Sequence, residues 1–151
     1  VFNFLEFDKI VYIDADCIVL KNIDDMFEFD TLSGNSLAHT GELEAGVLVL
    51  EPNLKHFEEL MLYKDKKNWK NHDQTLIDWY FRENIKELHD MPNEYHFCHK
   101  LYHNRDPNLF FNEEAKIIEF NGYKPWIPER WKSGEDIFYK IWIKKNITLL
   151  N

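Results

Sequence analysis

The sequence predicts an α/β fold in which helices cover both faces of a mostly parallel sheet. Three apolar runs, at residues 10–13, 46–50 and 115–120, indicate buried strands because they lack the polar alternation of a strand that faces water. Segments with helical spacing of apolar residues separate these runs, and such alternation of strands and helices is typical of this fold class. Ligands of these folds bind beyond the carboxyl ends of the strands.

Capping residues and chain breaks predict the elements between the strands. Asn53 can cap a helix, since its side chain can accept hydrogen bonds from the first turn, and Leu54, Phe57, Leu60 and Met61 would form the apolar face. In chain order, we expect a short helical turn at 22–29, a loop at 32–44 with a short strand near 37–39, the helix after Asn53, a helix at 73–84, a break at 91–93, an irregular stretch at 96–111 and a helix at 133–145.

Length, charge and cysteine content limit the possible functions. The chain has 151 residues, which fits one domain covering 1–151. Its 18 basic and 27 acidic residues give a net charge of −9, which disfavours nucleic acid as a partner. No apolar run approaches the ~20 residues of a membrane span, and no signal-like segment is visible, so we expect a cytoplasmic location. Two cysteines are too few for a disulfide framework.

Asp14 and Asp16 follow the first predicted strand and flank Ala15. Side chains two residues apart on an extended segment point the same way. Two such carboxylates suit a hard divalent cation such as Mg²⁺ or Mn²⁺, which can also bind the oxygens of a diphosphate. The motif is short, and a solvated strand end would explain the same residues. Both interpretations remain open from the residues alone.

Two further polar sets lie at predicted element ends. Asp73 and Gln74 open a helix, where the acid can act as a cap or the pair can bind sugar hydroxyls. After the third strand, Gly122 allows backbone N–H groups to approach an anion, and Lys124 supplies a charge for phosphate. A structural turn explains the second set equally well. The seven histidines form no metal-binding pattern and are interpreted as surface or hydrogen-bonded structural residues.

Five segments, taken in order, resemble one known family. They are KIVYIDADCIVLKNIDDMF, EAGVLVLEPN, HDQTLIDWYF, MPNEYH and KIIEFNGYKPW. Together they are similar to the family 8 glycosyltransferases, the glycogenin and galactosyltransferase-like group, over about residues 7–142. The resemblance implies a GT-A fold and a retaining transfer of a hexose from a nucleotide sugar, usually UDP-linked, to a sugar or protein acceptor, with Mn²⁺ (or Mg²⁺).

The resemblance also implies roles for individual residues. Asp14 and Asp16 match the metal-binding motif, and Glu119 stands at the position of the third metal ligand. Attack would occur on the front face of the sugar, with the donor phosphate helping to deprotonate the acceptor. The remaining roles are contact with the donor sugar and diphosphate by Glu44, Ala45, Gly46, Gly122 and Lys124, and catalytic contact beside the anomeric carbon by Asp73 and Gln74.

Several features depart from the family pattern. The family usually has His at the position of Glu119, an Asn at Glu44 and often an Asn at His96, and the spacing from Glu119 to Lys124 is one residue short. Family members also carry ~80–100 residues before the metal-binding motif, about a small half-domain, where this chain has thirteen. We therefore expect the first βα units and most uridine contacts to lie elsewhere, and the isolated chain to be poorly stable or to self-associate as an oligomer.

Two other functions compete with the transferase. A strand ending in Asp14 and Asp16 also resembles the haloacid-dehalogenase-type phosphatases, in which the first Asp is the nucleophile and the second the acid/base. Cys17 stands where Thr or Val is usual in that family, and no downstream acidic motif is visible. The other alternative is a catalytically degenerate glycosyltransferase-like domain that binds a sugar or a partner protein.

Overall fold

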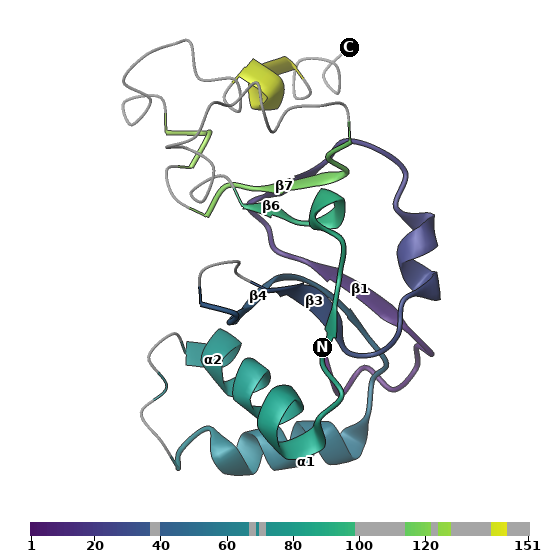
Figure 1. The fold of residues 1–151 in the computed structure, drawn as a ribbon, viewed down its shortest axis with the longest axis vertical. Helices are drawn as coiled ribbons and strands as arrows, with labels where there is room; N and C mark the ends of the chain where they lie inside the picture. The colour runs from purple at the N-terminus through teal and green to yellow at the C-terminus, as the bar shows by residue number, and fades with distance from the viewer. Residues whose placement is uncertain are drawn as a thin grey trace. The chain divides into compact units, whose positions relative to one another are not determined.

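The computed structural model describes residues 1–36, 40–66, 69, 72–98, 114–121, 124–127 and 140–144. The chain divides into two compact units (Figure 1). Unit 1 consists of Val1–Asp14 and Asn22–Asn93, and unit 2 of Ala15–Lys21 and Glu94–Asn151. The strand expected near 37–39 and most of the helix expected at 133–145 lie outside the described residues, whereas 140–144 is helical. None of the described helices has the length and apolar character needed to cross a membrane.

Unit 1 contains a sheet of four described strands in the order β1-β4-β3-β5. The strands are β1 (Ile10–Ile13), β3 (Ser33–Ser36), β4 (Leu43–Leu50) and β5 (His89–Asp90). β4 pairs antiparallel with both β1 and β3, whereas β3 and β5 are parallel. β4 is therefore an interior strand, and this position explains its continuous apolar sequence.

The expectation of a mostly parallel sheet is wrong for the described strands, since three of their five pairings are antiparallel. An apolar run without alternation reports burial on both faces and says nothing about strand direction. In β4, Leu48 and Leu50 on one face and Val47 and Val49 on the other are all at most 1% exposed. Both faces of β4 are thus covered, as expected, although the sheet to which β4 belongs is mixed.

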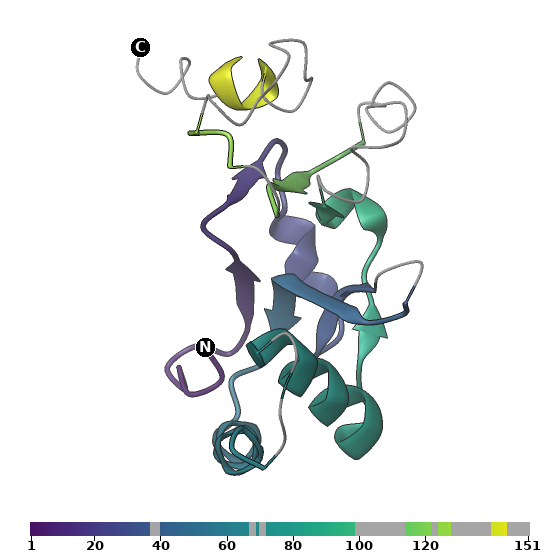
Figure 2. The same cartoon turned by 90° about the vertical axis from the view of Figure 1, so that its left-hand side faces the viewer.

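Two helices of unit 1 pack against the face of β4 that carries Leu48 and Leu50 (Figures 1 and 2). The helix α1 (Leu54–Tyr63) begins at the predicted cap, where Asn53 Oδ1 accepts hydrogen bonds from the backbone N–H groups of Lys55 at 2.9 Å and His56 at 3.3 Å. The helix α2 (His72–Trp79) continues into a π-helical turn, η2 (Tyr80–Ile85). The short 3₁₀ helix η1 (Asp24–Glu28) confirms the helical turn expected at 22–29.

Unit 2 contains a second sheet, with the described strands in the order β2-β7-β6. β2 (Cys17–Val19) and β7 (Ile117–Glu119) are antiparallel, and β6 (Phe97–Cys98) pairs with β7 in parallel. β6 and the 3₁₀ turn before it, η3 (Asn93–Tyr95), lie in or beside the stretch expected to be irregular. Ile118 and Phe120 are fully buried, and Trp142 packs on the same cluster.

Candidate functional site

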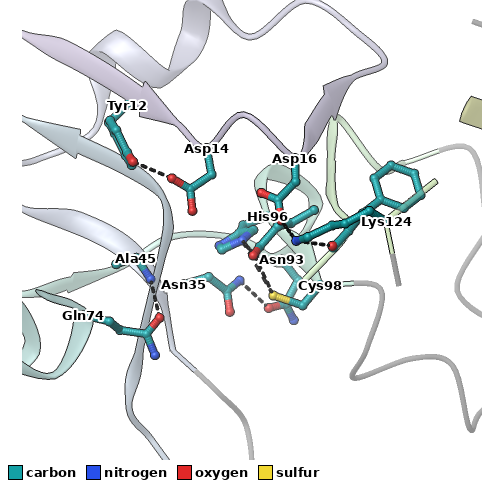
Figure 3. A network of polar contacts seen from close by, with 12 residues as sticks. Tyr12, Asp14, Asp16, Asn35, Ala45, Gln74, Asn93, His96, Cys98 and Lys124 are labelled. Atoms are coloured by element: carbon teal, nitrogen blue, oxygen red, sulfur yellow. Dashed lines mark hydrogen bonds and ion pairs between the residues drawn. The ribbon is translucent and has the colours of Figure 1, made fainter. Parts of the chain in front are cut away.

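Asp14 lies where β1 ends in unit 1. Its backbone N–H donates to the carbonyl oxygen of Gly46 at 2.8 Å, which continues the pairing of β1 with β4 by one residue. The Tyr12 hydroxyl donates a hydrogen bond to the Asp14 carboxylate (Figure 3). Side chains two apart on a strand share a face, so this contact follows from the sequence spacing, although our sequence analysis did not predict it.

Residues expected at the donor sugar meet at the start of β4. The backbone N–H of Ala45 donates to Gln74 Oε1 at 3.3 Å, which joins β4 to the first turn of α2 (Figure 3). The Asp73 carboxylate accepts from the backbone N–H of Gln74 at 3.0 Å, and Asp73 is exposed. Gly46 is buried and Glu44 half-buried. Unit 1 thus brings Asp14, Ala45, Gly46 and Gln74 into one connected set.

A partly exposed ion pair supports the start of β4. Asp78 Oδ1 accepts a hydrogen bond from the backbone N–H of Leu43 at 3.0 Å and from the side chain of Arg82 at 2.9 and 3.0 Å. Arg82 also donates to the carbonyl oxygen of Gly41 at 2.8 Å. The Asp-x-x-x-Arg spacing of one helical turn was the signal available in the sequence, and our sequence analysis missed it.

In unit 2, Asp16 and Lys124 form an ion pair (Figure 3). The Lys124 ammonium donates to the Asp16 carboxylate and, at 2.9 Å, to the carbonyl oxygen of Phe120. The backbone N–H of Phe120 in turn donates to the carbonyl oxygen of Asp16 at 2.9 Å. The two charged side chains are 34% and 16% exposed, so solvent reaches the ammonium. The residue predicted to contact phosphate therefore lies beside one of the predicted metal ligands, whereas Gly122 is outside the described residues.

Glu119 lies on β7 and is hydrogen-bonded to Cys98 of β6 and to His96, which directly precedes β6. His96 Nε2 is 2.6 Å from Glu119 Oε2, and the Cys98 thiol donates to the same oxygen at 3.3 Å. Burial raises the pKa of the Glu119 carboxyl, but the hydrogen bond and charge of His96, then the Cys98 bond and the Lys124 charge, lower it more, so the net pKa lies below its usual value. Glu119 is therefore ionised at neutral pH.

The described part of unit 2 offers two acidic ligands for a hard cation. Ligand oxygens of Asp16 and Glu119 lie within 4.8 Å of each other, a separation that one ion bound to both oxygens at about 2.0–2.6 Å can bridge. Asp14 belongs to unit 1 and is joined to Asp16 through Ala15. The donor set, consisting of carboxylate oxygens, fits Mg²⁺ or Mn²⁺.

Similar proteins are glycosyltransferases. The chain is 36% identical over 132 residues to an Arabidopsis thaliana protein with the provisional name UDP-glucuronate:xylan alpha-glucuronosyltransferase 5, which covers 83% of this chain and 22% of that protein. It is 29% identical to Glycogenin-1 of Mus musculus, with 80% of this chain and 38% of that protein covered. No family model matches the chain.

Solved structures agree on the fold. The glycosyltransferase GlyE of Streptococcus pneumoniae aligns with 95% of this chain and 44% of its own, at a TM-score of 0.64 and 22% identity. The galactosyltransferase LgtC aligns with 89% of this chain and 60% of its own, at a TM-score of 0.58 and 17% identity. This chain therefore spans less than two thirds of each of these proteins. The sequence relatives are family 8 glycosyltransferases, and the solved structures show that this chain has a GT-A-type α/β fold.

Proposed function

We propose that the chain carries donor-binding residues of a retaining glycosyltransferase, which transfers a hexose or a hexuronic acid from a UDP-sugar to a sugar or protein acceptor. The names of the relatives support a nucleotide-sugar donor, since the xylan glucuronosyltransferases are named for UDP-glucuronate. The observation that carries the proposal is the Asp16–Lys124 pair beside Glu119, because it combines carboxylates for a cation with an ammonium for phosphate.

The proposed metal ligands are Asp14, Asp16 and Glu119, with Mn²⁺ or Mg²⁺ as the ion. Bound there, the ion would offset the negative charge that develops on the departing diphosphate. Lys124 neutralises Asp16 in the present arrangement. We propose that this ammonium turns to the diphosphate when the donor binds, since a lysine ammonium on its flexible stem can bind either a carboxylate or a phosphate. Gly122 would supply a backbone N–H group to the same anion.

The donor sugar would lie against the set in unit 1. The bond from Ala45 N–H fixes the carbonyl oxygen of the Gln74 amide, so its NH₂ group is oriented as a donor for a sugar hydroxyl. Asp73 is exposed at the start of the same helix, and its carboxylate can accept a hydrogen bond from a sugar hydroxyl. The half-buried Ala45 adds little side-chain bulk beside the buried Gly46, and the neighbouring Glu44 is also half-buried. No protein base is assigned, because the donor phosphate would assist deprotonation of the acceptor.

A specific observation favours a second candidate, a degenerate domain that binds the donor without turning it over. The Glu119 carboxylate already accepts hydrogen bonds from His96 and Cys98, which reduces its capacity to coordinate a cation. The phosphatase alternative gains no such support, since the relatives named above are glycosyltransferases.

The experiment measures UDP binding and UDP release by the full protein with UDP-glucuronate, UDP-glucose and UDP-galactose, in Mn²⁺ and in chelator. We expect release with Mn²⁺ that is lost in Asp16→Asn and kept in Asp65→Asn, an exposed aspartate that serves as the charge-matched control. Metal-dependent binding without release from any donor would support the degenerate domain. Equal UDP affinity in Mn²⁺ and in chelator would contradict the metal-dependent site of both candidates.

A further inference from the structure

Three side chains with different donor atoms converge on one face of the sheet in unit 2. His96 precedes β6 and Cys98 ends it, so the two lie two residues apart and point to the same side. Glu119 ends β7, and the parallel register pairs Cys98 directly with Glu119. The imidazole, the thiol and the carboxylate therefore meet because of strand alternation and register, independently of any local sequence motif.

The cluster formed by these three side chains is buried. His96, Cys98 and Glu119 are 3%, 2% and 6% exposed, and one ligand atom from each lies within 4.8 Å of those of the other two. The other ring nitrogen of His96, Nδ1, is buried without a hydrogen-bond partner among the described residues. A ring that coordinates through Nε2 keeps its proton on Nδ1, so the argument for a metal rests on the three atoms that converge and not on Nδ1.

The distances are close to those of a zinc coordination shell. Zinc binds sulfur at about 2.3 Å and nitrogen or oxygen at about 2.0–2.2 Å, so the edges of a tetrahedral site measure roughly 3.4–3.6 Å. Cys98 Sγ lies 3.6 Å from His96 Nε2 and 3.3 Å from Glu119 Oε2. The 3.3 Å separation is about 0.1 Å below this range, and the 2.6 Å separation between His96 and Glu119 would open by about 0.8 Å when an ion replaces the hydrogen-bonded proton.

We propose that His96 Nε2, Cys98 Sγ and Glu119 Oε2 bind a zinc-type transition-metal ion, with a fourth position open to water. A thiolate and an imidazole select Zn²⁺ over Mn²⁺ and Mg²⁺, which prefer oxygen ligands alone. Binding releases the thiol proton to solvent and displaces the proton from His96 Nε2, so that Nε2 coordinates as a neutral imidazole whose proton is on Nδ1. This inference does not rest on the transferase function. It implies that zinc competes with the oxygen-ligand ion for Glu119.

The test titrates the full protein with Co²⁺, which reports thiolate coordination by a charge-transfer absorption in the near ultraviolet, and then with Zn²⁺. We expect one Co²⁺ per chain with this absorption, displacement by Zn²⁺ and no displacement by Mn²⁺. Cys98→Ser should abolish the absorption and weaken Zn²⁺ binding by at least the ~10–100-fold that loss of a supporting group costs. Cys17→Ser is the control for loss of a thiol and should change neither, because Cys17 pairs with Glu119 across β2 and β7 but its sulfur is not among the clustered ligand atoms.

A second measurement covers the case in which Cys98→Ser does not fold. Zinc-edge X-ray absorption of the unmodified protein should show one sulfur ligand at about 2.3 Å together with nitrogen or oxygen ligands. A zinc ion with oxygen ligands only, or Zn²⁺ affinity that survives both Cys98→Ser and His96→Gln, would overturn the proposal. The three residues would then form a hydrogen-bonded core contact only.

Discussion

Replacing Lys124 with methionine should change the affinities for the cation and for UDP in opposite directions. The methionine keeps most of the side-chain volume and removes the charge that neutralises Asp16. Without that partner, the Asp16 carboxylate attracts Mn²⁺ more strongly. The diphosphate of UDP, by contrast, loses a cationic contact. If Lys124 had a purely structural role, the substitution would instead weaken the binding of both Mn²⁺ and UDP, or of neither.

The magnitudes follow from the exposure of the pair. The Lys124 side chain is 34% exposed, so the ion pair with Asp16 contributes at most about 1 kcal/mol after screening. Loss of this ion pair in Lys124→Met should tighten Mn²⁺ binding by up to about fivefold in the absence of nucleotide. A charge-assisted contact with phosphate contributes about 1.5–3 kcal/mol, and the lower value applies at a solvated site. UDP should therefore bind about tenfold more weakly in saturating Mn²⁺.

Isothermal titration calorimetry can measure both affinities, with Lys116→Met as the control. Lys116 lies in the same unit and carries the same charge, but its ammonium donates to the Tyr95 hydroxyl at 2.7 Å. The control should leave both affinities within twofold, given a background effect of about 0.5 kcal/mol for an ordinary surface change. If Lys124→Met weakens Mn²⁺ binding, or leaves UDP binding intact, Lys124 does not act at the diphosphate.

Three further predictions concern stability. The pKa of Glu119 is lowered in the folded chain, so its carboxylate stabilises unit 2 above its ordinary pKa of 4.5, and this contribution is lost as the pH falls through the lower folded-state pKa. Glu119→Gln should therefore reduce the drop in melting temperature that acidification below the ordinary pKa causes, as measured by thermal unfolding at a series of acidic pH values. Gly34→Ala should lower the free energy of unfolding by about 1–3 kcal/mol in urea denaturation. The new Cβ would overlap Leu43 Cδ1 and lie 3.0 Å from Leu48 Cδ2. An unchanged urea midpoint would show that these leucines move aside. Asn53→Ala should cost about 1 kcal/mol through loss of the α1 cap, measured in the same way, whereas Asn53→Asp should keep most of it.

The elements that could be predicted from the sequence are those fixed by local signals. β1, β4 and the helix capped by Asn53 lie where apolar runs and the cap place them. β3 (Ser33–Ser36) was missed because its sequence, SGNS, has no strand propensity, and pairing with β4 and β5 forms it. Strand direction was predicted incorrectly because burial, which the sequence reports, is the same for both directions.

The candidate site divides in a similar way. Family resemblance identified Ala45 and Gln74, and the structure connects them by a hydrogen bond; their roles at the sugar remain a prediction. Nothing in the sequence placed Cys98 beside Glu119, because the two are 21 residues apart and meet through the register of β6 and β7. Non-local pairing of this kind leaves no periodic trace in the sequence. The interpretation of His96 as a hydrogen-bonded histidine holds, but its partner was not foreseen.

Two departures from the family pattern, at Glu119 and His96, concern side chains that contact each other in the structure. The family pattern that the sequence resembles has His at the position of Glu119 and often Asn at the position of His96, and these two side chains lie 2.6 Å apart. Restoring the pattern with Glu119→His and His96→Asn should therefore cost less than the sum of the single changes. Each single variant leaves a buried partner without its charge-assisted hydrogen bond and should lose about 1–3 kcal/mol. In the double variant the amide of Asn can pair with the new imidazole, so we expect a coupling of about 0.5–3 kcal/mol in a double-mutant cycle of urea unfolding. Additive losses would show that the two substitutions are independent and that their contact is incidental.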